Sequence, residues 1–225
     1  GTMMVNNINE TGNSSPWQLA AIGDTLYFSA NDGVSGPELW VTNGTESGTQ
    51  MVKNINGTGG GNPRFLTVIG NTLYFSATDG SSGYELWMSN GTDAGTLRVK
   101  DINETGDSTP SSLTAVGSAL YFIADNGLEG RELWVSDGTE SGTQMVKDIV
   151  PGTESSGPSR LTAVGSTLLF SAHDETHGRE LWVSDGTESG TQMVKDIYPG
   201  AESSMLDSFF AYGNKLLFSA DDAMN

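Results

Sequence analysis

The chain has 225 residues, and a hydrophobic content of 36% gives it enough apolar material to bury a core, which excludes a disordered chain. Its formal net charge of −18 repels nucleic acid and anionic membranes, so we expect neither nucleic-acid binding nor membrane insertion. There is no cysteine to form a disulfide, and no apolar run reaches the roughly 20 residues of a membrane span.

One segment recurs along the chain and organises it. Residues 131–149 read RELWVSDGTESGTQMVKDI and return letter for letter at 179–197, with looser copies at 38–55 and 85–102. The four copies place Trp40, Trp87, Trp134 and Trp182 at steps of 47, 47 and 48 residues. A period in this range is typical of repeat architectures, in which each repeat is one supersecondary unit.

Each repeat is predicted to form four short strands. In the third copy the predicted strands are Leu113–Val116, Ala119–Ala124, Glu132–Ser136 and Thr143–Ile149. Along the second of these strands Leu120 and Phe122 alternate with Tyr121 and Ile123, so both faces of the sheet are apolar. A sheet with two apolar faces must pack between neighbouring sheets, and four-stranded meanders joined by one longer connection are typical of propeller blades.

The number of copies predicts an all-β fold, a five-bladed β-propeller with four-stranded antiparallel blades. We expect one domain over residues 1–225, with repeats at about 1–47, 48–94, 95–141 and 142–189 and a partial repeat at 190–225. The third strand occurs four times and the other three occur five times, because Thr2–Ile8 (TMMVNNI) is a surplus copy of the fourth. We therefore expect this N-terminal strand to close the incomplete last blade, since an open array would leave unpaired strand edges.

Residues that are identical in every copy are expected to serve the repeat. The four tryptophans are interpreted as blade-to-blade packing, with sugar stacking as the minor alternative. A glutamate begins each third strand and a lysine lies late in each fourth strand, so the antiparallel pair is expected to set opposite charges across from each other.

The turn between the third and fourth strands reads NGTESGT, NGTDAGT or DGTESGT. Asn or Asp followed by Gly is typical of tight turns, which is the expected role of this segment. The alternative is a calcium site that uses Asp137 and Asp185, although Asn43 and Asn90 lower the charge in the other two copies. We expect no cofactor other than calcium.

Residues that differ between copies gather in the loops before the first and third strands. In an antiparallel meander these loops emerge at the same end of the blade, and loops on a rigid scaffold often carry binding sites. Aromatic rings stack on sugars and arginine binds carboxylates in a bidentate fork, which indicates an acidic glycan or an acidic peptide as ligand. The candidate ligand-binding residues are Trp17, Arg64, Phe65, Tyr84, Arg131, Arg160 and Arg179.

Two histidines, His173 and His177, occur in one of these loops in the order HDETH. The zinc-protease pattern is HExxH on a helix, and this segment has neither the order nor the helix. Zinc catalysis is therefore not expected.

The repeat resembles the bacterial family named for its ELWxxDGT signature, which is matched at Glu132–Thr139 and Glu180–Thr187. At Glu38–Thr45 and Glu85–Thr92 an asparagine replaces the aspartate of the signature. The resemblance covers nearly the whole chain. It implies a propeller-forming repeat of secreted or surface proteins of bacteria, mostly without an assigned activity, and hence an extracellular or cell-surface location within a larger multidomain surface protein.

Three hypotheses about function follow. The first is a non-enzymatic binding or adhesion module for a glycan or protein ligand, and the second is a multivalent lectin with a sugar pocket between each pair of blades. The third is a glycoside hydrolase of the sialidase type, because Ser76–Trp87 is similar to the Asp box of that family, with Asp79 one place late. Catalysis normally places special residues in one repeat, and none stand out here, so we do not expect an enzyme.

Overall fold

The computed structural model describes residues 1–57 and 59–224, and this part of the chain forms strands, turns and loops without any helix. Within it, therefore, no helix is long and apolar enough to cross a membrane. The chain divides into two compact units, Gly1–Pro110 and Ser111–Asn225.

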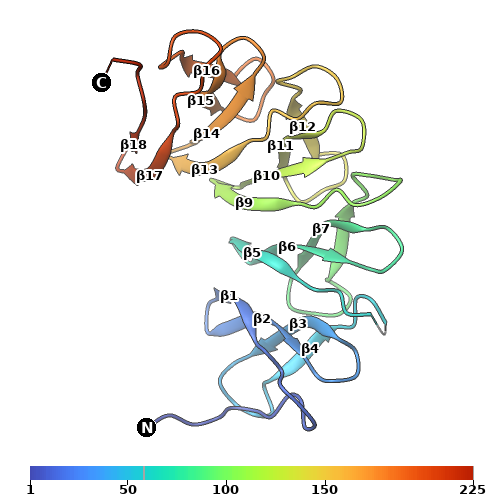
Figure 1. The fold of residues 1–225 in the computed structure, drawn as a ribbon. Coiled ribbons are helices and arrows are strands. Elements are labelled where there is room, and N and C mark those ends of the chain that lie inside the picture. The colour runs from blue at the N-terminus through green and yellow to red at the C-terminus, as the bar shows by residue number, and fades with distance from the viewer. Residues whose placement is uncertain (58, 225) are drawn as a thin grey trace. The chain divides into compact units, whose positions relative to one another are not determined.

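The first unit contains two four-stranded sheets (Figure 1). The strands of its first sheet are β1 (Trp17–Ile22), β2 (Thr25–Asn31), β3 (Pro37–Thr42) and β4 (Gln50–Lys53). The strands of its second sheet are β5 (Arg64–Ile69), β6 (Thr72–Thr78), β7 (Tyr84–Ser89) and β8 (Leu97–Lys100). In both sheets the spatial order follows the chain and every neighbouring pair is antiparallel.

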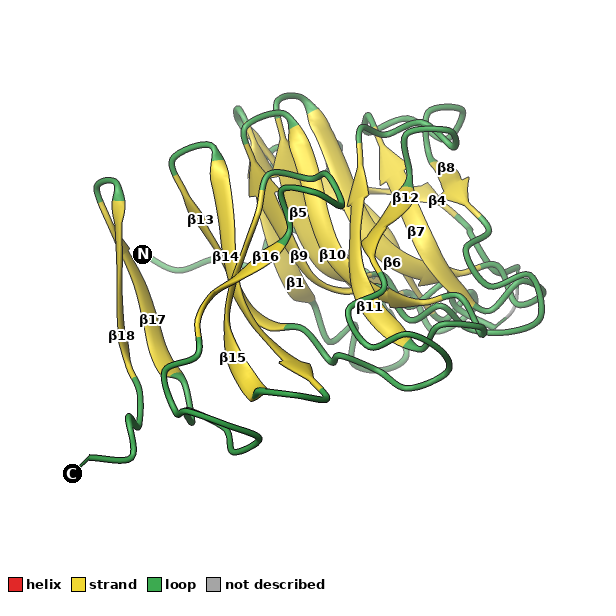
Figure 2. Cartoon of the chain, turned by 90° about the horizontal axis from the view of Figure 1, so that it is seen from above, coloured by secondary structure: helices red, strands yellow, loops and turns green. Residues whose placement is uncertain are grey.

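The second unit contains two further sheets of this kind and a hairpin (Figure 2). The strands of the first are β9 (Ser111–Val116), β10 (Ala119–Asp125), β11 (Arg131–Ser136) and β12 (Gln144–Lys147). The strands of the second are β13 (Ser159–Val164), β14 (Thr167–Asp174), β15 (Gly178–Ser184) and β16 (Gln192–Lys195). The hairpin consists of β17 (Asp207–Tyr212) and β18 (Lys215–Ser219).

These sheets are β-propeller blades, which confirms the predicted fold class. Over the described residues, four complete four-stranded meanders and one two-stranded partial repeat agree with the predicted repeat count. In the third copy the observed strands begin and end within two residues of the predicted ones. Below, each sheet is called a blade, numbered one to five along the chain.

The first strand of every blade carries a β-bulge at the same place. The pairing of β1 with β2 shifts register between Trp17 and Ala20, and the other four blades show the equivalent shift. One residue of each bulge has a positive φ of 53–58°: Gln18, Phe65, Ser112, Arg160 and Ser208. Because the strained position occurs in all five copies, it belongs to the fold, and it changes the direction of the side chains at the start of the strand.

Apolar packing between adjacent blades forms the core. In the first unit Leu39, Val41 and Val52 of blade one pack in one cluster with Phe75 and Trp87 of blade two. In the second unit the equivalent residues of blades three and four form the same kind of cluster around Phe170 and Trp182. The structure thus confirms that Trp87 and Trp182 serve blade-to-blade packing, as the repeat pattern predicted.

A tyrosine of one blade lies against a turn glycine of the next blade and leaves no room there for a side chain. In the second unit a Cβ atom added to Gly186 would lie 2.7 Å from the Tyr121 hydroxyl, and Gly91 has the same relation to Tyr27 in the first unit. Both glycines also have a positive φ, near 90°. At these two positions any other residue would meet the tyrosine as well as backbone strain. The positive φ is also present at Gly44 and Gly138, and it explains why this turn glycine occurs in every copy.

The N-terminal segment differs from its prediction. Residues 2–8 form no strand, and Met3 and Met4 are exposed, because no strand of the described residues pairs with this segment. Ile8 nevertheless packs against Phe28 and Trp40 of blade one. The expected strand is therefore wrong for this structure, whereas closure of the last blade by this segment stays a prediction.

The packing role of the tryptophans predicts the effect of truncating one. Trp87→Ala should lower the free energy of unfolding by about 3–5 kcal/mol, because it removes a buried side chain from the cluster between two blades. Trp17→Ala is the matched control, since Trp17 is 39% exposed, and it should cost less than about 1 kcal/mol. Urea unfolding followed by circular dichroism measures both values, and equal effects would contradict the packing role.

Candidate functional site

The most constant polar residues of the repeat are four buried glutamates. Glu38, Glu85, Glu132 and Glu180 have no exposed surface, although each places an ionisable side chain near the start of a third strand. The expected pairing of these glutamates with lysines is wrong. A bulge between Leu133 and Trp134 shifts the fourth strand by one residue, so that Lys147 lies opposite Leu133 instead of Glu132.

Each glutamate instead accepts hydrogen bonds from the loop that leads to the next blade. Glu85 Oε2 accepts from the Ile102 backbone N–H at 2.8 Å, and its Oε1 accepts from the Ser108 N–H at 3.1 Å. The Ser108 hydroxyl adds a third bond, at 2.7 Å. The other three glutamates bond the equivalent loop amides. The carboxylate thus ties both ends of each long loop to the blade. The predicted scaffold role holds, but the partners are loop amides and not lysines.

Burial changes the acidity of these carboxyls. Desolvation raises the pKa of Glu85 and of Glu132 to about 7, although the hydrogen bonds from the loop act in the opposite direction. The pKa of Glu38 is raised for the same reason. A raised pKa at a buried carboxyl can mark a catalytic acid, but here the same hydrogen bonds to the loop recur in every complete blade, and the glutamates lie away from solvent. We therefore assign it to the fold.

The turns at Asp137 and Asp185 have hydrogen-bonded turn geometry. Asp137 Oδ1 accepts from the Thr139 N–H at 2.9 Å and from the Thr139 hydroxyl at 2.7 Å, and Asp185 makes the same bonds with Thr187. These bonds lower the pKa of both aspartates. No group of three or more His, Asp or Glu side chains that could hold a metal ion occurs among the described residues. The turn accounts for the aspartates, and the calcium hypothesis stays a prediction.

The histidine loop forms a local ion pair. His177 Nδ1 lies 2.9 Å from Asp174 Oδ2, and Asp174 Oδ1 also accepts from the His177 backbone N–H at 2.6 Å. This contact raises the pKa of His177 and lowers that of Asp174. The pair stabilises one loop of blade four.

The loops before the first and third strands of each blade meet at one end of that blade, as expected. In blade two the Arg64 Nη2 lies 3.3 Å from the Tyr84 hydroxyl, and the guanidinium carbon lies 4.8 Å from the ring centroid. Arg64 and Tyr84 begin β5 and β7, so the structure brings these two candidates together as an exposed cation–π pair. Phe65, beside Arg64, is 42% exposed, and its backbone N–H donates to Gln18 Oε1 at 2.7 Å.

The other candidate arginines form hydrogen bonds or ion pairs with residues of the second unit, to which they belong. Arg179 donates to the carbonyl oxygens of Gly157 and Ser156, and desolvation lowers its pKa. Arg160 forms an ion pair of 2.7 Å with Asp207 of the next blade. Arg131 donates to the Ser111 hydroxyl at 2.8 Å. These three arginines therefore stabilise loops and blade contacts in the second unit.

A surface pocket surrounds Trp17 at this end of blade one. It has a volume of about 550 Å³ and is lined by Ser14, Ser15, Pro16, Trp17, Asn31, Pro37 and Asn62. Its walls combine one large aromatic ring, two prolines and several amide or hydroxyl groups, without a charged side chain. This composition is typical of a site that holds a neutral polar group against an apolar surface.

Comparisons with known proteins support the fold but do not identify a family. No family model and no curated protein matches the chain. Among solved structures, the computationally designed Ika8 protein aligns with a TM-score of 0.54 and 17% identity over 97% of this chain, which covers 59% of the designed chain. A puromycin hydrolase mutant aligns with a TM-score of 0.51 and 15% identity, over 83% of this chain and 30% of its own. At these identities the likeness shows the fold alone.

The buried glutamates predict an unusual pH dependence of stability. Between the ordinary glutamate pKa of 4.5 and the raised value of about 7, the folded chain binds more protons than the unfolded chain. The free energy of unfolding should therefore fall as the pH rises through this window. We expect the Tm at pH 5 to exceed the Tm at pH 8 by roughly 5 °C or more.

The double variant Glu85→Gln, Glu132→Gln is the control for this effect, because an amide cannot titrate. Its Tm should vary less between pH 5 and pH 8 than that of the natural chain. Scanning calorimetry at four pH values measures the difference. Parallel curves for the two proteins would assign the pH effect to the general negative charge instead.

The turn role of Asp137 predicts that asparagine can replace it. Asn43 Oδ1 accepts the same two bonds from Thr45, so Asp137→Asn should leave the Tm within about 2 °C of the natural value. Asp137→Ala removes the acceptor and should lower the Tm by more than that. Melting curves with EDTA and with millimolar calcium complete the test, since a rise in Tm that only the aspartate protein shows would establish a calcium site.

Proposed function

We propose that the chain is a non-enzymatic propeller module of the ELWxxDGT-repeat kind, which binds a ligand with the loops before its first and third strands. One observation carries the proposal. Apart from the lysine of each fourth strand, most residues that are the same in every copy are buried or form turns, whereas exposed aromatic side chains and arginines stand at positions that differ between copies. Loops of this kind on a rigid scaffold are where binding commonly resides.

Blades one and two hold the groups best placed for recognition. Trp17 lines the pocket of about 550 Å³, and the Arg64–Tyr84 pair and Phe65 are exposed at the same positions of the next repeat. An aromatic face stacks on a sugar ring, and the guanidinium binds a carboxylate with two parallel hydrogen bonds. An acidic glycan supplies both groups and is the ligand that we favour, with an acidic peptide as the second candidate.

The differences between copies favour one site over a series of equal sites. The position of Trp17 is taken by Arg64, Ser111, Ser159 and Asp207 in the other blades. A multivalent lectin would need the same binding residues in each blade, and these positions do not provide them. The hydrolase hypothesis gains no support, because the match to puromycin hydrolase covers 30% of that chain and concerns the fold alone.

The proposed location is extracellular, at the surface of a bacterium and within a larger protein. Its support is the ELWxxDGT resemblance, together with the strongly acidic composition, which favours solubility.

A glycan array that includes sialylated and uronic-acid sugars, with acidic peptides printed beside them, tests the proposal. Trp17→Ala and Arg64→Ala should each weaken binding to the best probe at least about tenfold, because each removes a main contact group. Leu128→Ala is the matched control, since this exposed loop residue lies at the same end of blade three. Binding that survives both changes and is lost on Asp137→Ala, Asp185→Ala would place the working surface at the opposite turns.

A further inference from the structure

The pocket beside Trp17 lies where blade one departs from the repeat. The residue before the buried glutamate is Pro37 in this blade, and it is Tyr84, Arg131 or Arg179 in the other complete blades. Pro37 lines the pocket. Its short, fixed ring cannot extend across to the first strand as the longer side chains can.

In the other complete blades the longer side chain reaches the first strand. Arg131 donates to the Ser111 hydroxyl at 2.8 Å, and Ser111 has the position of Trp17 in blade three. The equivalent contact occurs at 3.5 Å in blade four, and in blade two the Tyr84 hydroxyl accepts from Arg64. A protein side chain therefore occupies the corresponding space in these blades, whereas in blade one the space is open to a ligand.

The loop opposite Pro37 differs in the same blade. Proline has no backbone N–H to donate, whereas the Arg131 N–H donates to Ser155 Oγ at 2.9 Å, and blades two and four have equivalent bonds. Gly60 has the position of Ser155 in blade one, and a Cβ atom there would lie 2.7 Å from Pro37 Cδ. The proline and the glycine fit each other, so the open space is part of how blade one is built.

Two asparagines of the pocket have side-chain atoms available for a ligand. Asn31 Oδ1 accepts from the Gly33 N–H at 2.7 Å, and Asn62 Nδ2 donates to the Gly60 carbonyl at 3.0 Å, so backbone partners fix the orientation of both amides. Within the described part of the chain, Asn31 Nδ2 and Asn62 Oδ1 have no hydrogen-bond partner. The pocket thus offers one donor group and one acceptor near an aromatic ring and two prolines.

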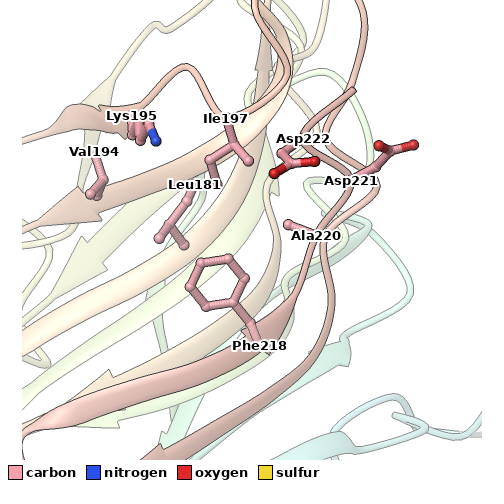
Figure 3. A pocket seen from close by; sticks show the side chains of 8 residues that line it. All are labelled: Leu181, Val194, Lys195, Ile197, Phe218, Ala220, Asp221 and Asp222. Atoms are coloured by element: carbon pink, nitrogen blue, oxygen red, sulfur yellow. The ribbon is translucent and has the colours of Figure 1, made fainter. Parts of the chain in front are cut away.

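A larger pocket of the second unit, of about 820 Å³, has a different chemistry (Figure 3). Val194 and Phe218 contribute apolar surface there, and Figure 3 shows the carboxylates of Asp221 and Asp222 at one end. Among the described residues that line it, none carries a side-chain amide. The pocket beside Trp17 is the one suited to a neutral amide group.

We propose that this pocket binds the acetamido group of an N-acetylated sugar. The acetamido carbonyl accepts from Asn31 Nδ2, its N–H donates to Asn62 Oδ1, and its methyl group packs against Trp17 and Pro37. This inference rests on the proposed function and names the class of sugar that the site selects.

The carboxylate of the same sugar has a place beside the pocket. Gln18 follows Trp17, and its Oε1 accepts from the backbone N–H of Phe65, which follows Arg64. The beginnings of β1 and β5 are therefore neighbours, and the exposed guanidinium of Arg64 lies on the next strand from Trp17. A sialic acid carries both an acetamido group and a carboxylate, so it can use both positions.

The test measures the affinity of the full chain for two methyl glycosides by isothermal titration calorimetry. The first is that of N-acetylneuraminic acid. The second is that of the sialic acid with a hydroxyl in place of the acetamido group, which keeps the carboxylate. The chain should bind the first at least about tenfold more tightly, because the second leaves the two asparagine side chains without their partners.

Asn31→Asp removes the donor and keeps the acceptor that Gly33 uses, as Asp125 Oδ1 accepts from Gly127 in blade three. It should reduce the preference for the acetylated sugar to less than about twofold. Both sugars are acids, so the added negative charge cancels in this ratio.

Asn43→Asp is the matched control, because it makes the same change in an exposed turn of blade one where Asp137 shows that aspartate is accepted. It should leave the preference unchanged. Pro37→Arg is the second test variant. It fills the space as Arg131 does in blade three, and it should also remove the preference.

Circular dichroism melting shows that each variant is folded. Equal affinity of the unaltered chain for the two sugars would overturn the acetamido inference and leave glycan binding in place. A preference that survives in folded Asn31→Asp, or the absence of saturable binding of both sugars at millimolar concentration, would overturn it as well. The proposed function fails separately, when no glycan or acidic peptide of the array shows binding that depends on Trp17 or Arg64.

Discussion

A sheet that is apolar on both faces is stable only between two neighbours, and the structure depends on this constraint. In the second unit Tyr121 of β10 is buried in one cluster with Phe170 and Trp182 of the next blade. No single blade can remove both faces from water, so each repeat needs the next one. Because the tryptophan of one blade seals the apolar wall of the blade before it, packing and repeat order depend on the same residues.

The buried glutamates are the polar counterpart of that packing. The chain must leave the outer edge of one blade and return to the inner edge of the next, which leaves a long loop whose backbone amides need acceptors. A carboxylate at the start of the third strand accepts from amides at both ends of this loop, in blade three from Ile149 and Ser156. Desolvation raises the pKa of such a group, so the carboxyl that holds the loop ionises less easily than it would in water.

The strands, the blades and the role of the tryptophans could be predicted from the sequence, because they follow from alternation and spacing that recur in every copy. The partner of Glu132 could not. A single bulge moves Lys147 from the expected position opposite Glu132 to one opposite Leu133, and strand patterns do not show bulges. The candidate face could be predicted in part. Arg64 and Tyr84 lie together, whereas Arg160 and Arg179 are engaged by Asp207 and by loop carbonyls that only the folded chain brings near.

In a repeat protein most residues that are identical in every copy serve packing or turns. Features that are specific to one protein, such as ligand recognition, must therefore come from positions that differ between copies. In this chain the repetition breaks in the loops before the first and third strands, where the position of Trp17 in one repeat becomes Arg64 in the next. Such a change alters the chemistry at one end of a blade and leaves the packing between blades intact, because loop substitutions away from the core cost little stability.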